Sequence, residues 1–383
     1  MSTHTPAPAP APAPGAVPVE LAETAASDLS APPSERGVAV VTGGSAGIGR
    51  AVVRELAARG WDVAVLARGR DGLAGAVADV AGAGRRGLGL VCDVAHREQV
   101  EAAATRVEAE LGPVEVWVNN AMASVFAPFS DTDPDDFERA TAVTYFGQVH
   151  GTRAALERMR PRDRGHVVQI GSALAFRGIP LQAAYCGAKH AVVGFTESVI
   201  TELRHEGSRV QVSMVHMPGM NTTQFGWVRT TEPKHPQPVA PIWQPEACAK
   251  VVAEVVDHPR RRTWVGESTV YTILGSWVAP WFVDRYLART GVDGQLTDQP
   301  RSTMRGDYLD APVPGDAGAR GEFDDQSWSW SPQVWLQQRR HAVDVVGTAA
   351  LALGAVTAAA AASASVRRRR GTPAARVQRW LGR

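Results

Sequence analysis

Cysteine and lysine are both scarce in this chain of 383 residues. The three cysteines lie far apart in the sequence, which excludes a disulfide framework and a zinc site built from paired ligands, so we expect a reducing compartment. Only three of the 40 basic residues are lysines. The formal net charge of +1 gives no overall field that would attract nucleic acid or acidic partners. The 44% of hydrophobic residues is ordinary for a chain with a buried core, which excludes a fibrous or wholly disordered protein.

Residues 1–36 lack the pattern of a secretory signal, since no basic stretch precedes a hydrophobic one. They contain the run PAPAPAPAPG and almost no apolar periodicity. Proline fixes φ and removes backbone donors, so such a run stays extended and solvated. We therefore predict a disordered Pro/Ala-rich leader over these residues.

From residue 38 onward, short valine-rich runs alternate with helical stretches. Segments such as 97–112 have apolar residues that recur at helical spacing. Continuous apolar strands separated by helices indicate a parallel sheet covered on both faces. The sequence thus predicts an α/β, doubly wound, Rossmann-like domain over residues 37–270. The runs that we expect to form strands are 38–41, 63–66, 88–92, 114–118, 167–170 and 210–215.

The pattern changes after residue 270. Residues 271–340 are rich in Trp, Gly, Pro and Asp, show no clear periodicity, and are interpreted as an irregular extension. Residues 341–383 contain a run of 22 uncharged residues, 345–366, followed by a basic tail. We expect this C-terminal part to form an Ala-rich helix. The chain shows no internal repeat.

A glycine-rich loop, TGGSAGIG at 42–49, directly follows the first predicted strand and opens a helix. In this context Gly43 allows a tight turn, Gly47 lets the backbone approach a phosphate, and Gly49 lets helix and strand pack closely. The helix N-terminus offers free N–H groups to a pyrophosphate. The sequence therefore predicts a dinucleotide site, with a flexible turn as the alternative. The loop residues expected to bind the cofactor are Gly43, Ser45, Gly47, Ile48 and Gly49.

Arg68 follows the second predicted strand, 19 residues beyond Gly49. An acidic residue at this point would bond the adenosine ribose hydroxyls and favour NAD. An arginine can instead bind a 2′-phosphate through two parallel hydrogen bonds. The sequence favours NADP over NAD, and a solvated surface arginine is the alternative interpretation of Arg68.

Tyr185 and Lys189 stand four residues apart in a predicted helix, and therefore on one face of it. A free tyrosine has a pKa of about 10 and is a poor base at neutral pH. A nearby ammonium group favours the phenolate and lowers that pKa, so Tyr185 could exchange a proton with a carbonyl or alcohol oxygen. An ordinary helix face is the alternative, which the scarcity of lysine in this chain disfavours.

Together these motifs resemble those of the short-chain dehydrogenase/reductase family. In order, the chain carries the glycine loop, a D-V pair after the third strand, an N-N-A run after the fourth, a serine thirteen residues before Y-x-x-x-K, and a P-G turn followed by threonine. The resemblance implies that Asp93 contacts the adenine and that Asn119 stabilises the central strands. It also implies that Ser172 hydrogen-bonds the substrate oxygen, that Lys189 holds the nicotinamide ribose, and that Thr222 holds the carboxamide.

The chain departs from the family pattern at two positions. Met122 stands where the family has glycine in N-N-A-G, which puts a bulky side chain near the cofactor or the substrate mouth. Thr144 stands where the family often has an asparagine, at a helix kink that holds a water for proton relay. These departures keep a catalytically weak dinucleotide sensor open as an alternative function.

We interpret the chain as an NADP-dependent oxidoreductase that interconverts a carbonyl and an alcohol by hydride transfer, with Tyr185 as general acid and base. Residues 221–245 should form a substrate lid. Trp227 and Trp243 within the lid favour an apolar small-molecule substrate, with ordinary packing of the lid as the alternative. The family resemblance implies a homodimer or homotetramer. No nucleic-acid or metal site is predicted.

Residues 345–366 would rise about 33 Å as a helix, enough to span a hydrocarbon core of about 30 Å. Their many alanines make insertion marginal, and a single span would separate basic flanks that both belong on the cytoplasmic side. We therefore predict a cytoplasmic protein that touches the inner face of a membrane peripherally through this segment. A soluble helix packed on the dimer, or a membrane-organising scaffold, is the alternative.

Overall fold

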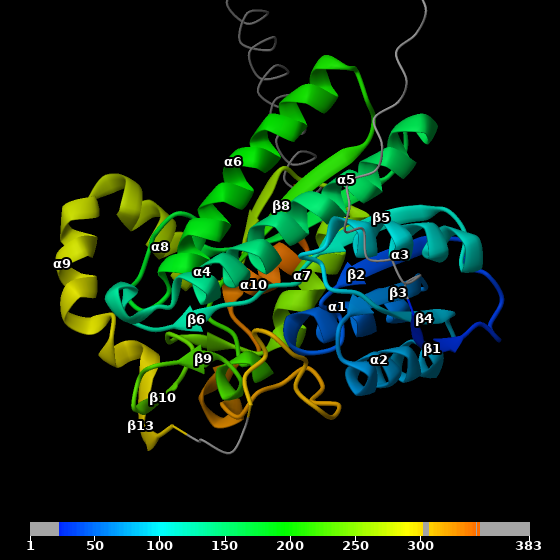
Figure 1. Cartoon of the computed structure of the whole chain (residues 1–383). Helices are drawn as coiled ribbons and strands as arrows, with labels where there is room; N and C mark the ends of the chain where they lie inside the picture. The colour runs from blue at the N-terminus through cyan, green and yellow to red at the C-terminus, as the bar shows by residue number, and fades with distance from the viewer. Residues whose placement is uncertain (1–22, 302–305, 342, 345–383) are drawn as a thin grey trace, which may run out of the picture. The chain divides into compact units, whose positions relative to one another are not determined.

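A computed structural model describes residues 23–301, 306–341, 343 and 344 of the chain. An eight-stranded sheet forms its centre, in the order β1-β4-β3-β2-β5-β7-β8-β12 (Figure 1). Every neighbouring pair is parallel except β1 with β4, which is antiparallel. The strands are β1 (Thr24–Asp28), β2 (Val38–Thr42), β3 (Asp62–Ala67), β4 (Gly87–Val91), β5 (Val114–Asn119), β7 (His166–Ser172), β8 (Gln211–Met217) and β12 (Arg262–Trp264).

Helices cover both faces of this sheet, because alternate residues of each strand point to opposite faces. Val38 and Val40 of β2 pack into one core, whereas Ala39 and Val41 pack into the core on the other face. Every residue of β2 and β3 is buried. The first core is covered by α3 (Arg97–Glu110), α5 (Gly147–Met159) and α6 (Ala183–His205), and the second by α1 (Gly47–Ala58), α2 (Arg70–Gly82) and α7 (Pro245–Asp257).

The predicted fold class is confirmed, and all six expected strands are present with ends that shift by at most two residues. Two edge strands were not expected. β1 lies within the predicted disordered leader, so that prediction is wrong for residues 24–28. Its sequence, TAASD, gives no apolar signal, and it is held by pairing with β4. β12 has three residues, which is too short for any periodicity to appear.

Residues 267–300 are more ordered than the sequence predicts. Two helices form here, α8 (Glu267–Val278) and α9 (Pro280–Thr290), and they project from the domain (Figure 1). Pro280 begins α9, where its missing N–H costs no helical hydrogen bond. β13 (Leu296–Pro300) then pairs with β10 (Lys234–Pro236) of the lid region. The prediction of an irregular extension is therefore wrong for this part.

A second compact unit begins at residue 335. Its described residues, 335–341, 343 and 344, are mostly helical, and Arg340 pairs there with Asp344 at 2.9 Å. The predicted Ala-rich helix at 345–366 and residues 1–22 of the leader lie outside the described residues. Among the helices that the structure describes, none has the length and apolarity needed to cross a bilayer.

Candidate active site

A cavity of about 1060 Å³ opens at the carboxyl ends of the parallel strands, where doubly wound sheets bind their ligands. The glycine loop, the ends of β3 and β7, the start of α6 and the lid region all contribute to its wall. Gly49 and Asn119 lie behind this wall, and the buried Asn119 amide donates to the Thr152 hydroxyl at 3.0 Å. The predicted site residues that line the cavity are Gly43, Ser45, Gly47, Ile48, Arg68, Asp93, Ser172, Tyr185, Lys189 and Thr222.

The glycine loop has the geometry of a phosphate site. Gly43 and Gly47 adopt φ angles of +64° and +57°, which favour glycine. Gly49 leaves no room for a side chain, because a Cβ there would lie 2.2 Å from the Gly43 carbonyl oxygen. No side chain in the described part of the chain caps α1 at Ala46. The start of α1 lines the cavity, and apart from Gly47, whose N–H the Gly318 carbonyl accepts at 3.0 Å, its first N–H groups have no helical partner, so the loop fits the pyrophosphate of a dinucleotide.

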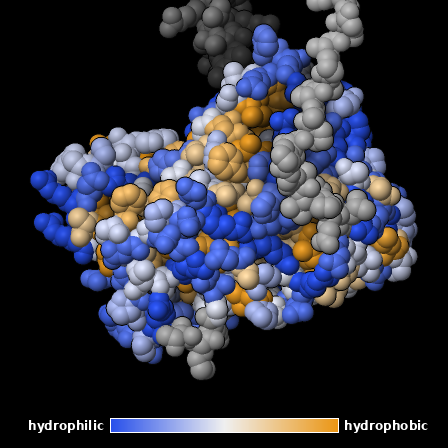
Figure 2. Space-filling view, in the orientation of Figure 1, coloured by the Kyte–Doolittle hydropathy of each residue, from blue (hydrophilic) through white to orange (hydrophobic). Residues whose placement is uncertain are grey.

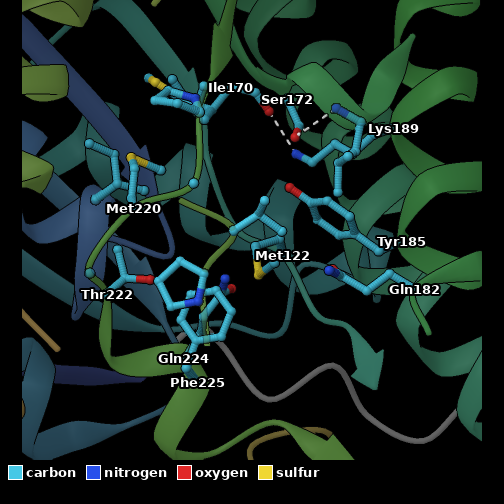
Figure 3. A pocket seen from close by; sticks show the side chains of 18 of the residues that line it. Met122, Ile170, Ser172, Gln182, Tyr185, Lys189, Met220, Thr222, Gln224 and Phe225 are labelled. Carbon is cyan, nitrogen blue, oxygen red and sulfur yellow. Dashed lines mark hydrogen bonds between the residues drawn. The ribbon is translucent and has the colours of Figure 1, made fainter. Parts of the chain in front are cut away.

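Ser172, Tyr185 and Lys189 meet on one side of the cavity (Figure 3). Ser172 ends β7, and its hydroxyl accepts the Leu174 N–H at 3.1 Å and lies on the side of Tyr185 of α6 (Figure 3). The Lys189 Nζ lies 5.7 Å from the centre of the Tyr185 ring and donates a 2.7 Å hydrogen bond to the Ile170 carbonyl. The structure therefore brings together the three side chains that the sequence singles out for proton transfer.

Burial dominates the titration of Tyr185 and Lys189. It lowers the pKa of Lys189 to about 7. It raises the pKa of Tyr185 above the ordinary value, and the hydrogen bond with Ser172 acts against that rise. The expectation that Lys189 lowers the pKa of Tyr185 is therefore not met in the protein alone. The Lys189 ammonium is itself desolvated, and it is already hydrogen-bonded to a backbone carbonyl.

A π-helical turn, Ala142–Phe146, lies between α4 (Pro134–Thr141) and α5. Thr144 is buried in this turn, and its hydroxyl makes two short hydrogen bonds with one residue. It accepts the Ala123 N–H at 2.8 Å and donates to the Ala123 carbonyl at 2.7 Å. These bonds fix the chain directly after Met122, which lines the cavity. Thr144 therefore supports the wall of the site.

Arg68 lies at the expected place after β3, but its guanidinium binds the protein's own backbone. It donates to the carbonyl oxygens of Leu309 and Asp310 at 3.0 and 3.1 Å, and also to that of Tyr308. Burial lowers the pKa of Arg68, and the charge of Asp93 opposes this shift. Because Arg68 is half-buried and hydrogen-bonded, the alternative of a solvated surface arginine is wrong. Its binding of a 2′-phosphate stays a prediction.

These carbonyls belong to a segment that sequence reasoning did not connect with the site. Residues 306–321, which we call the strap, run along the carboxyl edge of the sheet. Asp316 pairs with the buried Arg50 at 2.9 Å, and the Gly318 carbonyl accepts the N–H of Gly47 at 3.0 Å. The strap is rich in Gly, Pro and Asp and has no periodicity, so no sequence signal could have placed it here. The strap residues that line the cavity are Tyr308, Pro312, Val313, Gly315 and Ala317.

The two lid tryptophans have different surroundings. Trp227 lines the cavity, whereas Trp243 is fully buried and packs edge-to-face on Trp328 with ring centroids 6.0 Å apart. Trp243 therefore stabilises the protein and says nothing about the substrate. Met122 and Phe225 contribute further apolar surface to the cavity (Figure 3). Within the described ranges, no group of three or more His, Cys, Asp or Glu side chains could hold a metal ion.

Residues 37–233, about half of the chain, match the short chain dehydrogenase family. The chain belongs to the short-chain dehydrogenase family. It is 30% identical over 269 residues to the oxidoreductase YxnA of Bacillus subtilis, an alignment that covers 69% of this chain and 74% of YxnA. It is also 32% identical over 200 residues to the 3-oxoacyl-(acyl-carrier-protein) reductase FabG of Haemophilus influenzae, which covers 51% of this chain and 79% of FabG.

Two solved structures of the family share the fold. A metagenomic short-chain oxidoreductase in complex with NADP is 29% identical, with a TM-score of 0.51 over 60% of this chain and 95% of that one. A short-chain dehydrogenase/reductase of Burkholderia phymatum in complex with NAD is 22% identical, with a TM-score of 0.58 over 65% of this chain and 95% of that one. The family match ends at residue 233, so the strap lies outside it.

Proposed function

We propose that the protein is an NADP(H)-dependent oxidoreductase that interconverts a carbonyl and an alcohol on an apolar small molecule. The observation that carries this proposal is the convergence of Ser172, Tyr185 and Lys189 with the glycine loop in one cavity. Membership of the family and the oxidoreductases among the relatives support the same reaction class. A protein that only bound a dinucleotide would have no need of all three polar side chains.

The three side chains have different roles, two at the substrate oxygen and one at the cofactor. A bound nicotinamide dinucleotide would supply or accept the hydride. Tyr185 keeps its proton at neutral pH because burial raises its pKa, so it can donate that proton to a carbonyl oxygen as the general acid. Ser172, which lies beside Tyr185, would donate to the same oxygen. Lys189 lies beside the Tyr185 ring and would hold the ribose of the cofactor.

The preference for NADP rests on Arg68, where an acid would favour NAD. The strap carbonyls take three of the five N–H donors of Arg68, which leaves two for a 2′-phosphate. A hydrogen bond between two charged groups is about twice as strong as one between neutral groups, and Arg68 can bind a phosphate with two of them. These bonds therefore favour a cofactor with a 2′-phosphate. The 29% identical relative solved with NADP supports this proposal.

The apolar substrate is proposed from the walls of the cavity opposite Tyr185. Met122, Met220 and Phe225 face the cavity there, and Trp227 adds a partly exposed ring (Figure 3). Such walls favour a hydrocarbon group next to the reacting carbonyl, because apolar surface is removed from water on both sides. Ser172, Tyr185 and Lys189 lie where the oxygen would be, and Thr222 and Gln224 add polar groups near Phe225 (Figure 3).

We further propose a cytoplasmic homodimer or homotetramer. Apolar side chains gather over α5 and α6 (Figure 2), and Phe146, directly before α5, is 48% exposed. Pairing of these helices between copies would bury that patch. The three cysteines are free and buried, which suits a reducing compartment. Peripheral membrane contact through residues 345–366 is proposed from the sequence alone.

The test is a substrate screen with the purified full-length protein. NADPH and NADH oxidation would be followed with a panel of aliphatic and cyclic ketones, aldehydes and quinones, and the reverse reaction with the matching alcohols. We expect turnover with NADPH on apolar ketones that Tyr185→Phe abolishes. Absence of turnover with every substrate and both cofactors would overturn the proposal, as would equal rates in the Tyr185→Phe variant.

A further inference from the structure

Tyr308 of the strap enters the same cavity as Tyr185, although it lies 123 residues further along the chain. Its backbone N–H donates to the Trp227 carbonyl at 3.1 Å, and its hydroxyl oxygen accepts the Ser124 N–H at 3.0 Å. The ring packs between two of the hydrophobic clusters of the domain. Backbone and hydroxyl are thus both anchored, so the phenol has a fixed position in the wall.

The Tyr308 hydroxyl has a proton left to donate. A phenol oxygen that accepts an N–H still carries its own hydrogen, and no described group accepts that hydrogen from Tyr308. Burial raises the pKa of Tyr308, and the neighbouring Tyr185 raises it further, so the phenol stays protonated through the neutral range. Tyr308 is therefore a permanent hydrogen-bond donor at the cavity surface.

We propose that Tyr308 is a specificity-determining residue that donates a hydrogen bond to a second oxygen of the substrate. The substrate class is then an apolar ketone or alcohol that carries a second carbonyl or hydroxyl oxygen. This inference rests on the proposed function, because Tyr185 and Ser172 take the reacting oxygen. A buried donor left without a partner disfavours substrates that lack the second oxygen.

Matched ketones test this role. Full-length wild type and Tyr308→Phe would be compared with NADPH on cyclohexanone, cyclohexane-1,2-dione and cyclohexane-1,3-dione. In wild type, kcat/KM should favour at least one dione over cyclohexanone. The variant should lose about 10-fold in kcat/KM on that dione and less than about 3-fold on cyclohexanone, since one hydrogen bond is removed. The control Tyr145→Phe alters a tyrosine outside the cavity wall and should leave kcat/KM on both the dione and cyclohexanone unchanged.

The outcomes separate the two proposals. Equal losses of the variant on dione and monoketone, or a wild type without preference for either dione, would overturn the role of Tyr308 while leaving the proposed function in place. Absence of any NADPH oxidation by wild type would instead overturn the proposed function. Unchanged NADPH affinity and thermal unfolding of Tyr308→Phe would show that the loss does not come from misfolding.

A second inference comes from the contacts that hold the strap against the cofactor loops. Asp316 pairs with Arg50 at 2.9 Å, and Arg50 is 2% exposed. The Gly318 carbonyl holds the N–H of Gly47 in the phosphate loop at 3.0 Å. The cavity persists beneath the strap and is lined by both, so the strap forms a wall of the groove and does not fill it.

We infer that the strap encloses the bound dinucleotide and must open for the cofactor to exchange. This inference rests on the cavity being the cofactor site, as the proposed function requires. An enclosing wall slows entry and release alike, because both need the same opening, and it leaves the equilibrium affinity nearly unchanged. A strap that competed for the site would slow only entry.

Rates of NADPH binding and release, followed by stopped-flow fluorescence, distinguish these cases. We expect Asp316→Ala to raise both rates about 10-fold with a change in Kd of less than about 3-fold. The control is Asp298→Ala, which removes an exposed pair with Lys234 outside the strap and should change neither rate. Unchanged rates in Asp316→Ala, or faster entry with unchanged release, would overturn the inference. Failure of wild type to bind NADPH at all would overturn the proposed function.

Discussion

The parallel sheet and the C-terminal extension are stabilised in different ways. In the sheet, valine-rich strands such as β2 and β3 are buried on both faces. In the extension, Val278 and Trp281 are 82% and 63% exposed, and the strap is held by Asp316 and by carbonyls around Arg68. Apolar burial needs no defined partner, whereas polar contacts do. The sheet is thus stabilised mainly by apolar burial, whereas the extension is held by polar contacts and contributes part of the cavity wall.

The largest effects should come from α6, in the family-matched region. Tyr185→Phe is expected to lower turnover by a factor on the order of 10² or more, the usual scale for a lost general acid, with cofactor affinity nearly unchanged. Lys189→Ala should reduce both turnover and affinity, because the proposed role of the ammonium includes a hydrogen bond to the ribose. Steady-state rates and cofactor titrations measure both. Wild-type turnover in both variants would show that the catalytic assignment is wrong.

Stability should also depend on a buried charge at the start of β3. Asp62 of β3 is fully buried and pairs with Arg85 at 2.7 Å and Arg86 at 2.8 Å. Asp62→Ala would leave both arginines without this partner and should lower the free energy of unfolding by about 3 kcal/mol. Chemical denaturation measures this change, with Asp298→Ala of the extension as the control. Similar losses of unfolding free energy in Asp62→Ala and Asp298→Ala would contradict the claim that the sheet contributes more to stability than the extension does.

An intermediate effect is expected where the two regions meet, at Arg68. Arg68→Gln should weaken NADPH binding by about 2 kcal/mol, since one charged hydrogen-bonding group is lost. NADH binding should change by less than about 0.5 kcal/mol, because NADH has no 2′-phosphate. Fluorescence titration with both cofactors shows whether Arg68 binds the 2′-phosphate or only holds the strap. Equal weakening of both would mean that Arg68 serves only to hold the strap.

The smallest effect should come from the exposed aromatic residues of the projecting helices. Trp281→Ser in α9 is expected to change the free energy of unfolding by less than about 0.5 kcal/mol, because the side chain is already in water. Thermal and chemical unfolding of the full chain provide the measurement. A loss above about 2 kcal/mol would show that this surface is covered by another part of the assembly.

Much of the sheet and of the polar site could be predicted, because their signals are local. The glycine loop before a helix and the spacing of four residues between Tyr185 and Lys189 each define a local arrangement that does not depend on distant parts of the chain. β1 could not be predicted, since its edge position is set by pairing with β4 and not by its own apolar pattern. The hydrogen-bond partners of Arg68 could not be predicted either, because about 240 residues separate Arg68 from the strap.

The titration of the site also depends on packing that a sequence does not show. A lysine near Tyr185 suggests a lowered tyrosine pKa, but burial raises it instead. Tyr308 gave no signal at all, because it lies in a segment without periodicity and reaches the site only through the path of the strap. Functional residues contributed by an irregular extension are therefore the ones that sequence reasoning misses.

A crystal structure of the full chain with NADPH bound tests most directly the claim that both regions build one site. We expect the pyrophosphate at the N-terminus of α1, the nicotinamide beside Tyr185 and Ser172, and the strap closed over the dinucleotide, with Asp316 still paired to Arg50. A cofactor bound elsewhere would contradict the claim, as would a cofactor at α1 with the strap displaced from the cavity.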